Sequence, residues 1–538
     1  MPTTVLLDSR RPITLESALK KDSNIISEAA HAVAAADLSK TLWDNRLTIS
    51  GLVKHHLGLN AAYRCAVAPP ERWIKGSFNI CIPVRVSRCD AHTSSAPADE
   101  QTLIFRCAMP HKIAQGSVDE KLGCEVGTYA WMQSHCPEVR IPHLYGFGFS
   151  DHRHFTHEGR MPFYVRFWHT IRRRLRYVLG SVLGFSGFTG FLSHYAAHPA
   201  SHLRLPAAYT LLEYIGPDTG RMLSETWKTH RDDQHRRQRL FQGLSRILLS
   251  LARVPQPRIG SFHFSDDGMV TLTNRPLLCN VAILENDGAP RTIDETYPCV
   301  EPFVADLLDL HDGHFLANQN AVEDANDCRC QMAYRTLLRT LSYHFVRGRV
   351  RSRRRRNDGP FHLQLTDFHQ SNIFIDDDWN VTCLIDLEWV CALPAEMLAV
   401  PYWLTGLGID ELVDDKLVEF NSVHQQFISV LKEVEEEEGG VATLSSTIHD
   451  SWESGAVWFW YSLDSVNAML TLVEDHIITP QFGRMFTADV EVLSKYWCQG
   501  SREVVNKKVA DHDKYVEELE LLFDPSSGDG AAPVSREC

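Results

Sequence analysis

The residues between 364 and 389 combine carboxylates and an amide around a short apolar hairpin. Asp367 precedes the hairpin, and Asn372 opens its first strand five residues later. The chain turns at 376–380 and returns as a second strand that ends at Asp386. Because a hairpin brings its two ends together, Asn372 and Asp386 are predicted to be neighbours. A carboxylate beside an amide oxygen suits Mg²⁺, which takes few protein ligands and leaves room for phosphates and water.

The spacing of these polar residues is that of the catalytic loop and metal hairpin of kinases: Asp, Asn at +5, and Asp about 14 residues further on. An ordinary loop and hairpin with surface acids is the alternative. The segment closely resembles the aminoglycoside phosphotransferase and choline-kinase-like branch of the kinase fold, most of all its large fungal-type set. The pattern of that family is H-G-D-x-x-x-x-N, a short hairpin, and then I-D-x-E-W.

The resemblance implies that Asp367 is the catalytic base, that Asn372 and Asp386 are the Mg²⁺ ligands, and that ATP is the phosphate donor. The chain departs from the family pattern at Leu365 and Thr366, which stand where the family has His and Gly. That His usually braces the loop backbone, so its loss leaves two interpretations open, an active enzyme and an inactive relative.

Two further polar residues of this segment, His369 and Glu388, lie near the proposed site and are candidates for substrate contact. A structural hydrogen-bonding role is the alternative for both.

A short turn upstream resembles the phosphate-covering loop of the family; its residues are Gly76, Ser77, Phe78 and Asn79. Glycine allows a close approach of the backbone to phosphate, and amide N–H groups can meet the anion. A simple turn is the alternative reading of these four residues.

The next strand carries Arg106 where kinases have the phosphate-binding lysine, and Glu125 follows 19 residues later in a predicted helix. Arginine can hold a phosphate bidentately, so the charge is kept while the geometry differs. In kinases a helix glutamate at this place pairs with the strand cation. A surface arginine and a solvent-facing glutamate are the alternatives.

Residues 209–216 match the lobe-joining hinge of the family. The apolar strand ends in Glu213, Tyr214 and Ile215, whose main-chain groups are candidates to bond an adenine edge. An ordinary core strand is the alternative. The likeness to the fungal-type set covers roughly residues 60 to 500 and includes three segments without evident chemistry, which are 252–262, 272–277 and 387–406.

The elements that must position these residues change along the chain. Alternating apolar residues predict strands at 78–86, 102–108, 144–149 and 208–214, with a surface linker at 90–99 and a helix at 118–136. Helical periodicity predicts helices at 23–38, 42–57, 233–254 and 331–345, and a hairpin at 374–385 interrupts the helical part.

The predicted fold class is α+β, a bilobal protein-kinase-like fold with a small N-lobe of antiparallel sheet plus one helix and a larger helical C-lobe. The predicted boundaries are a helical extension at 1–60, an N-lobe at 61–215 with an insertion at about 150–205, a C-lobe at 216–523, and a disordered tail at 524–538.

Composition limits the classes of protein. The 538 residues are 44% hydrophobic and 23% charged, which excludes a disordered, collagen-like or low-complexity chain. The formal net charge of −14 disfavours a general nucleic-acid binder, and acids in a cleft would steer a cationic or amino-bearing acceptor. The 14 cysteines include no CxxC pair, as expected of free thiols in a reducing compartment, and no targeting segment stands out, so we expect a cytoplasmic protein.

Charged and apolar segments outside the motifs allow other partners. The apolar stretch 177–192 is shorter than a spanning helix and follows the basic run 171–176, which could rest on an anionic membrane; an insertion packed on its own domain is the favoured reading. The Arg-rich run 347–356 and the acidic run 433–438 are interpreted as solvated faces, with an anionic partner or a nuclear-import signal as the alternative for the arginines.

Three functional hypotheses result. The first is an ATP- and Mg²⁺-dependent phosphotransferase acting on the hydroxyl or amine of a small molecule. The second is a pseudokinase that binds nucleotide or a protein partner, in line with Leu365 and with Arg106 in place of lysine. The third, the least favoured, is a membrane- or nucleic-acid-associated protein acting through its basic segments. No motif identifies the acceptor or the oligomeric state, and no specific nucleic acid is expected.

Overall fold

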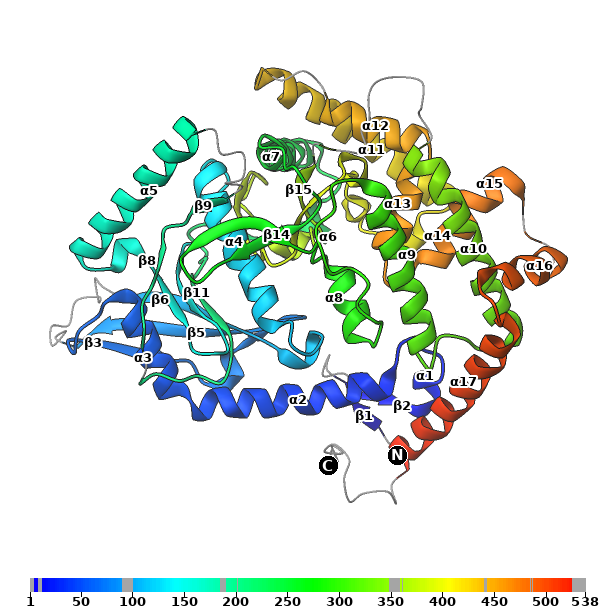
Figure 1. Cartoon of the computed structure of the whole chain (residues 1–538), viewed down its shortest axis with the longest axis horizontal. Helices are drawn as coiled ribbons and strands as arrows, with labels where there is room; N and C mark the ends of the chain where they lie inside the picture. The colour runs from blue at the N-terminus through cyan, green and yellow to red at the C-terminus, as the bar shows by residue number, and fades with distance from the viewer. Residues whose placement is uncertain are drawn as a thin grey trace.

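A computed structural model describes residues 4–7, 12–89, 100–183, 190–200, 202–347, 359, 361–439, 443–483, 485 and 487–524. The chain is a mixed α+β protein whose sheets are antiparallel, as predicted (Figure 1). The predicted linker at 90–99, most of the Arg-rich run and the predicted tail beyond residue 524 lie outside the described residues. Within the described residues, no helix is long and apolar enough to cross a membrane.

The largest sheet is formed by strands from the first 213 residues, in the order β10-β8-β7-β11-β6-β5-β3, with β4 paired to β5. Its strands are β3 (Tyr63–Val67), β4 (Ile74–Lys75), β5 (Asn79–Arg88), β6 (Gln101–Ala108), β7 (Leu144–Gly148), β8 (His154–His157), β10 (Tyr195–Ala197) and β11 (Tyr209–Glu213). The alternation that predicted β5 is real: Ile80, Ile82 and Val84 are fully buried on one face. The four strands predicted for this region are confirmed, with ends shifted by one or two residues.

The segment predicted as an insertion at about 150–205 is only partly separate from the sheet. Strands β8 and β10 lie within it and extend the main sheet beyond β7. Between them the helix α5 (Phe163–Leu183) stands at the edge of the molecule, and β9 (Gly190–Leu192) pairs with β14 (Met269–Asn274) (Figure 1).

One helix, α4 (Val118–His135), packs against β13 (Ser261–Phe264), which pairs with β14. A glycine makes this packing possible, because a Cβ at Gly127 would lie 2.7 Å from Phe262 Cβ. The close contact fixes the distance between α4 and β13. Helix α4 carries Lys121 and Glu125, which face the main sheet.

The predicted hairpin is formed by β16 (Ile373–Ile375) and β17 (Val381–Leu384), and β12 (Arg221–Met222) joins it as a third strand. Next to it, β15 (His362–Leu365) pairs with β18 (Val390–Leu393). The candidate catalytic loop therefore lies between two small sheets that hold both of its ends.

The second half of the chain is mostly helical. Its longer helices are α6 (Leu223–His230), α7 (Gln234–Ala252), α8 (Cys279–Asn286), α9 (Val300–Ala317), α10 (Ala325–Arg347), α11 (Asp414–Glu437), α12 (Leu444–Glu453), α13 (Ala456–Asp464), α16 (Thr487–Trp497) and α17 (Ser501–Phe523). Short turns are α14 (Met469–Leu472), α15 (Thr479–Phe482), the π-helical η9 (Val473–Ile478) and the 3₁₀ turns η1 (Pro70–Arg72), η2 (Pro110–Lys112), η3 (Glu158–Arg160), η5 (Gln370–Asn372), η6 (Ala395–Met397), η7 (Tyr402–Thr405) and η8 (Ile409–Glu411).

The sequence signals that predicted α7 are those that form it. Asp233 caps its first turn by accepting hydrogen bonds from the His235 and Arg236 amides, and Leu240, Leu244 and Leu251 are fully buried along one face.

The first 60 residues differ from the predicted wholly helical extension. They begin with the hairpin β1 (Thr4–Leu6) and β2 (Pro12–Thr14), followed by α1 (Leu15–Ala18), α2 (Ile25–Asp44) and α3 (Arg46–Leu57). The start of α2 packs on the C-terminal helix α17, where the Ile25 amide donates to the Tyr515 hydroxyl at 3.1 Å. The other end of α2 buries Leu42 in the core beside the main sheet, so this helix connects the two ends of the molecule (Figure 1).

Histidines gather where α3 meets the main sheet. His56 is fully buried; its Nδ1 lies 2.7 Å from Thr156 Oγ1, and its Nε2 lies 2.7 Å from the Tyr209 hydroxyl. The rings of His55 and His198 stack with their centroids 3.7 Å apart. Burial lowers the pKa of His56 well below its ordinary value, and the neighbouring histidines lower it further.

We expect this histidine cluster to make the fold less stable as the pH falls from about 6.5 to about 4. Burial lowers the pKa of His55, His56 and His154, and lowers the pKa of His198 to about 4. Above pH 6.5 these rings are neutral in both states. Below it the unfolded chain binds protons that the folded chain excludes, which favours unfolding by about 1.4 kcal/mol per pH unit for each proton.

The measurement is the melting temperature as a function of pH for the wild type and for His154→Gln with His198→Gln. The variant removes two titrating rings and is expected to show a shallower decrease. His202 also lies close to His55 and stays in both proteins. If the melting temperature fell equally steeply with pH in the two proteins, His154 and His198 would not be a cause of the loss of stability.

Candidate functional site

A buried arginine brings together residues from the sheet, the helix and the hairpin. Arg106 on β6 is 7% exposed; its Nη1 donates to Glu125 on α4, and its Nη2 donates to Asp386. The same Nη2 lies 3.1 Å from Glu388 Oε2. The predicted partner of Arg106 is thus in contact with it, and Asp386 at the end of the hairpin contacts the same arginine.

A second cation, Lys121, was missed by the sequence analysis. Lys121 is 1% exposed; its Nζ donates to Glu388 and lies 3.2 Å from Asn79 Oδ1. The signal that could have found it is its position one turn before Glu125, since residues four apart share a helix face. Two cations, Arg106 and Lys121, therefore face the carboxylates of Glu125, Asp386 and Glu388.

The partners of Glu388 favour the structural alternative to a substrate contact. It is 2% exposed, and its Oε2 accepts from Asn79 Nδ2 at 2.7 Å as well as from Lys121. Burial acts to raise the pKa of Glu388, but Lys121 and Arg106 hold that pKa below its ordinary value. Through Asn79 and Lys121, the ionised Glu388 side chain links β5 and α4 to the segment after the hairpin.

Two cations face three carboxylates in this cluster, and Asp386 is the carboxylate whose charge is least well neutralised. Burial raises its pKa to about 7; Arg106 opposes the rise, and the charges of Glu388 and Glu125 add to it. Its backbone has a φ of 62°, in the left-handed region where few non-glycine residues lie. Such strain is often found at functional sites, and here it turns the carboxylate out of the strand direction toward Arg106.

The two predicted metal ligands lie next to each other across the hairpin. The Ile385 amide, one residue before Asp386, donates to the Asn372 carbonyl at 2.9 Å. The Asn372 side chain is nearly buried, and its Nδ2 donates to the Asp367 carbonyl at 3.0 Å. These bonds join the loop that carries Asp367 to both strands of the hairpin.

The Asp367 carboxylate is partly buried and has His369 as a neighbour, with 3.6 Å between Asp367 Oδ1 and His369 Nε2. Burial raises the pKa of Asp367; His369 opposes this and the Glu388 charge adds to it. His369 Nδ1 accepts from the Ser371 amide at 3.2 Å, which orients the ring. The sequence analysis missed Asp464 at the end of α13, whose pKa burial raises to about 7 with a further contribution from Asp367.

Other bonds brace the loop where the family histidine is absent. The Thr366 amide and hydroxyl both donate to the Trp389 carbonyl at 3.0 Å, and the Cys279 amide donates to the Thr366 hydroxyl at 3.3 Å. On the far side, Trp403 Nε1 donates to the Phe368 carbonyl at 2.6 Å. Thr366 and Trp403 therefore hold the backbone on either side of Asp367.

The candidate phosphate loop is the turn between β4 and β5, and its four residues divide into two pairs. Gly76 and Ser77 are exposed, and the Gly76 amide donates to the Asn79 carbonyl at 2.9 Å. Phe78 and Asn79 are buried; the Phe78 ring meets Trp389 edge-on at 4.9 Å between centroids. The side chains of Phe78 and Asn79 thus support the hairpin, which leaves Gly76 and Ser77 as the residues that a phosphate could approach.

The candidate hinge begins at Glu213, the last residue of β11. Its three residues differ in whether their main-chain N–H and C=O groups are already hydrogen-bonded. The Glu213 amide donates to the His143 carbonyl at 2.9 Å, and the Glu213 carboxylate accepts from the His143 amide and from Arg140. Glu213 therefore cannot offer its N–H to an adenine. In the part of the chain that the structure describes, no backbone hydrogen bond is found for Tyr214 or Ile215. The strand register places Glu213 three residues from the position opposite Arg106, roughly 10 Å along the sheet.

Two cavities border the cluster. The space beside Arg106, Lys121 and Glu125 measures about 10 Å³, enough for a single water. A cavity of about 930 Å³ begins at Gly76, Ser77 and Phe78 and is closed by the start of α2, the end of α8 and the residues after α13. The larger cavity contains both acids and cations; its charged lining residues include Glu28, Lys75, Lys112 and Asp287.

The donor set fits a hard cation that takes most of its ligands from outside the protein. Among the described residues, no group of three or more His, Cys, Asp and Glu side chains could hold a metal by itself. One carboxylate, Asp386, and the amide of Asn372 suit Mg²⁺, whose remaining positions are filled by phosphate oxygens and water. The residues present therefore fit an ion that arrives with a phosphate compound.

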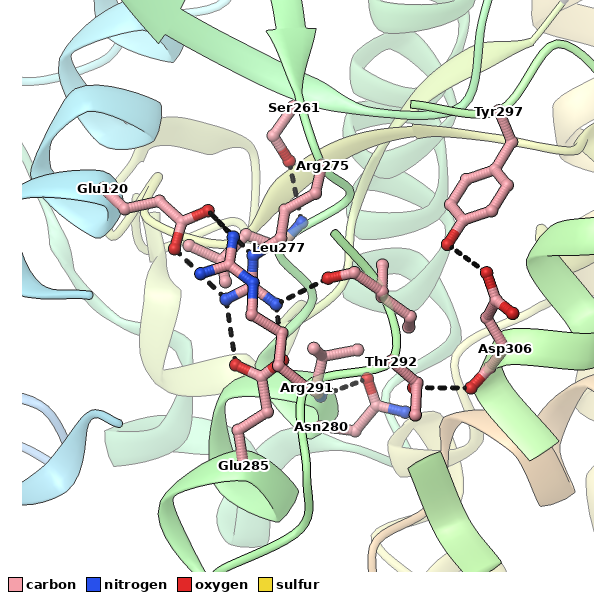
Figure 2. A network of polar contacts seen from close by, with 12 residues as sticks. Glu120, Ser261, Arg275, Leu277, Asn280, Glu285, Arg291, Thr292, Tyr297 and Asp306 are labelled. Carbon is pink, nitrogen blue, oxygen red and sulfur yellow. Dashed lines mark hydrogen bonds and ion pairs between the residues drawn. The ribbon is translucent and has the colours of Figure 1, made fainter. Parts of the chain in front are cut away.

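A network of polar contacts anchors α4 on the side away from Arg106 (Figure 2). Arg275 is fully buried; it contacts the carboxylates of Glu120 on α4 and Glu285 on α8, and donates to the Ile293 carbonyl at 3.0 Å. The half-exposed Arg291 lies 3.3 Å from Glu120. Residues 272–277, for which the sequence suggested no chemistry, thus fix the helix that carries Lys121 and Glu125.

Neither protein-family models nor curated proteins give a match to this chain. The functional conclusion therefore depends on the contacts of Arg106, Glu125, Asp367, Asn372 and Asp386 within the chain itself.

Proposed function

We propose that this chain is a phosphotransferase that uses Mg²⁺ and ATP and transfers the phosphoryl group to a hydroxyl or amine of a small molecule. The observation that carries the proposal is the triple contact of Arg106 with Glu125 from the helix and with Asp386 and Glu388 from the segment after the hairpin. In kinases a strand cation paired with a helix glutamate and an aspartate that binds Mg²⁺ are required together, and Arg106, Glu125 and Asp386 are grouped in this way beside the nearly buried Asn372.

The proposal includes the fold. It takes residues 61–215 as the N-lobe and residues 216–523 as the C-lobe of a bilobal, protein-kinase-like arrangement similar to aminoglycoside phosphotransferases. In support, the main sheet and α4 provide Arg106 and Glu125, while the helical half provides the hairpin and its loop.

Each residue of the site has a role in this proposal. Asp367 orients the acceptor and takes its proton as the bond from the acceptor to the γ-phosphorus forms and the bond from that phosphorus to ADP breaks. Asn372 and Asp386 would hold the metal, and Arg106 would turn to the phosphates while Lys121 stays on Glu388. When bound, Mg²⁺ would neutralise charge on the phosphate oxygens. The exposed backbone of Gly76 and Ser77 would cover the phosphates; because the Gly76 amide already donates to the Asn79 carbonyl, the Ser77 amide is the one that would meet the anion.

Binding of the metal requires an exchange of partners at Arg106. Arg106 now neutralises Asp386, so Asp386 can hold a cation only when Arg106 turns toward a phosphate. The space of about 10 Å³ beside Arg106 must also open before a triphosphate can enter. The cavity of about 930 Å³ that begins at Gly76 has the size of a small-molecule site, but Asp367 does not line it.

A second candidate function is a non-catalytic nucleotide- or partner-binding protein. The ion pair between Arg106 and Asp386, together with the closed space beside it, favours this candidate, because both must be undone before the metal can bind. A non-catalytic protein that binds nucleotide would hold it at the same place as the enzyme but would not transfer its phosphoryl group.

The test of the proposal is nucleotide-dependent thermal stabilisation. We expect ATP with Mg²⁺ to raise the melting temperature of the wild type, since a ligand at 100 times its Kd stabilises by about 2.7 kcal/mol. The part of the shift that depends on Mg²⁺ is expected to disappear in Asp386→Asn. Asp377→Asn, an exposed aspartate at the turn of the same hairpin, is the matched control and is expected to behave like the wild type.

Absence of any stabilisation of the wild type by ATP would contradict the proposal. Stabilisation without measurable phosphoryl transfer to water or to any of a panel of amino-sugars, alcohols and amines would favour the non-catalytic candidate.

A further inference from the structure

The helix α5 presents its apolar side to solvent. The exposed large apolar residues are Phe163, Tyr164, Phe167, Trp168, Ile171 and Leu175. Their spacing places them on one side of the helix, within about 140° at 100° per residue. Phe163 is 82% exposed and Trp168 is 66% exposed, so these rings do not pack on the rest of the protein.

The opposite, polar side of α5 holds the helix to the molecule. Arg173 Nη2 donates to Glu158 at 2.6 Å, and Arg172 Nη2 donates to Asp267 at 2.9 Å. A surface helix of a globular protein normally turns its apolar stripe inward and its charges outward. In α5 this arrangement is reversed, at the outer edge of the molecule (Figure 1).

The charge of α5 is opposite to that of the whole chain. Residues 163–183 contain five arginines and no aspartate or glutamate, while the chain has a net charge of −14. Within the described residues, Arg166 and Arg174 make no ion pair. Arg174 is seven residues after Phe167 and lies on the same side of the helix, so aromatic and cationic groups are presented together.

This combination selects one kind of partner. Phe, Tyr and Trp side chains favour the boundary between lipid headgroups and acyl chains, and arginines beside them meet anionic headgroups while their stems stay in apolar surroundings. A helix with such a face lies in the plane of the membrane and does not span it.

We propose that α5 docks this protein on an anionic lipid membrane, with Phe163, Phe167 and Trp168 inserted at the headgroup boundary and Arg166 and Arg174 against the lipid phosphates. This inference is independent of the proposed phosphotransferase function, because the residues of α5 take no part in the candidate site. The expectation that residues 177–192 pack on their own domain concerns a segment whose side chains before residue 190 lie outside the described residues.

The test is flotation of the full-length protein with vesicles of phosphatidylcholine alone and of phosphatidylcholine mixed with phosphatidylserine. We expect binding to the anionic vesicles that weakens with added salt. Phe167→Ser with Trp168→Ser is expected to weaken binding more than about tenfold. Arg166→Gln with Arg174→Gln is expected to weaken it about fivefold for each arginine removed.

The matched control is Val418→Ser with Tyr496→Ser, which removes two exposed apolar side chains from α11 and α16. The control is expected to bind vesicles like the wild type. All four substituted α5 positions are exposed, so the melting temperatures are expected to stay close to that of the wild type.

Three results would overturn the proposal. One is the absence of wild-type binding to anionic vesicles, and another is equal binding of the wild type and both α5 variants. The third is wild-type self-association, measured by light scattering, that the aromatic variant abolishes without any effect on vesicle binding; the apolar face would then serve a second copy of the chain.

Discussion

Replacing Asp367 with asparagine is expected to reduce phosphoryl transfer from ATP about 1,000-fold while leaving the binding of Mg²⁺ and ATP nearly unchanged. A positioned base commonly contributes 100- to 10,000-fold, and Asn keeps the shape of the side chain but cannot accept a proton. Binding is expected to persist because Asn372 and Asp386 are untouched and the Asp367 main-chain carbonyl still accepts from Asn372. The measurement is turnover of labelled ATP together with nucleotide-dependent thermal stabilisation.

Two comparisons make this result specific. Asp378→Asn changes an exposed acid at the hairpin turn and is expected to keep wild-type turnover. His369→Gln is expected to reduce turnover by about tenfold, because the His369 ring lies 3.6 Å from the Asp367 carboxylate and helps to position it. If Asp367→Asn kept wild-type turnover, Asp367 would not be the base.

Removing the buried guanidinium of Arg275 is expected to give the largest loss of stability. Arg275→Met leaves the carboxylates of Glu120 and Glu285 facing each other without their shared cation. Breaking a buried ion pair from one side costs about 3–5 kcal/mol, since the remaining charge stays buried without a partner. Urea unfolding followed by fluorescence and by circular dichroism measures the change. Because α4 carries Lys121 and Glu125, stabilisation by ATP is expected to decrease as well.

The control is Arg291→Met, which removes the half-exposed second cation near Glu120 and is expected to cost less than about 1 kcal/mol. Combining Arg275→Met with Glu120→Gln and Glu285→Gln removes the uncompensated charges and is expected to recover part of the loss. Wild-type stability of Arg275→Met alone would mean that the network does not anchor α4.

The contacts of the hairpin could be predicted because they are local. Asn372 and Asp386 are joined by a two-stranded turn, so spacing alone brings them together. The contact of Arg106 with Glu125 is not local, and only the likeness to kinases suggested it. The strands of the main sheet were predictable for a related reason, since alternating residues such as Ile80 and Ile82 are buried on one face.

Other features depend on tertiary contacts that a single sequence does not show. Lys121 and Arg275 read as ordinary surface cations, yet burial between acids from distant segments decides their roles. Thr366 braces the catalytic loop through Trp389 and Cys279, so the missing histidine did not predict a loose loop. Likewise, a basic and aromatic stretch gave no sign of which side of α5 would face solvent, because its anchors, Glu158 and Asp267, lie elsewhere in the chain.

The central claim is that Asn372 and Asp386 hold Mg²⁺ with ATP beside Arg106. The most direct measurement is a crystal structure of the protein with Mg²⁺ and a non-hydrolysable ATP analogue. We expect the ion about 2.1 Å from an oxygen of each ligand side chain, and the Arg106 guanidinium turned from Asp386 to a phosphate. A nucleotide bound elsewhere, or an unbroken Arg106–Asp386 pair with no metal at Asp386, would contradict the claim.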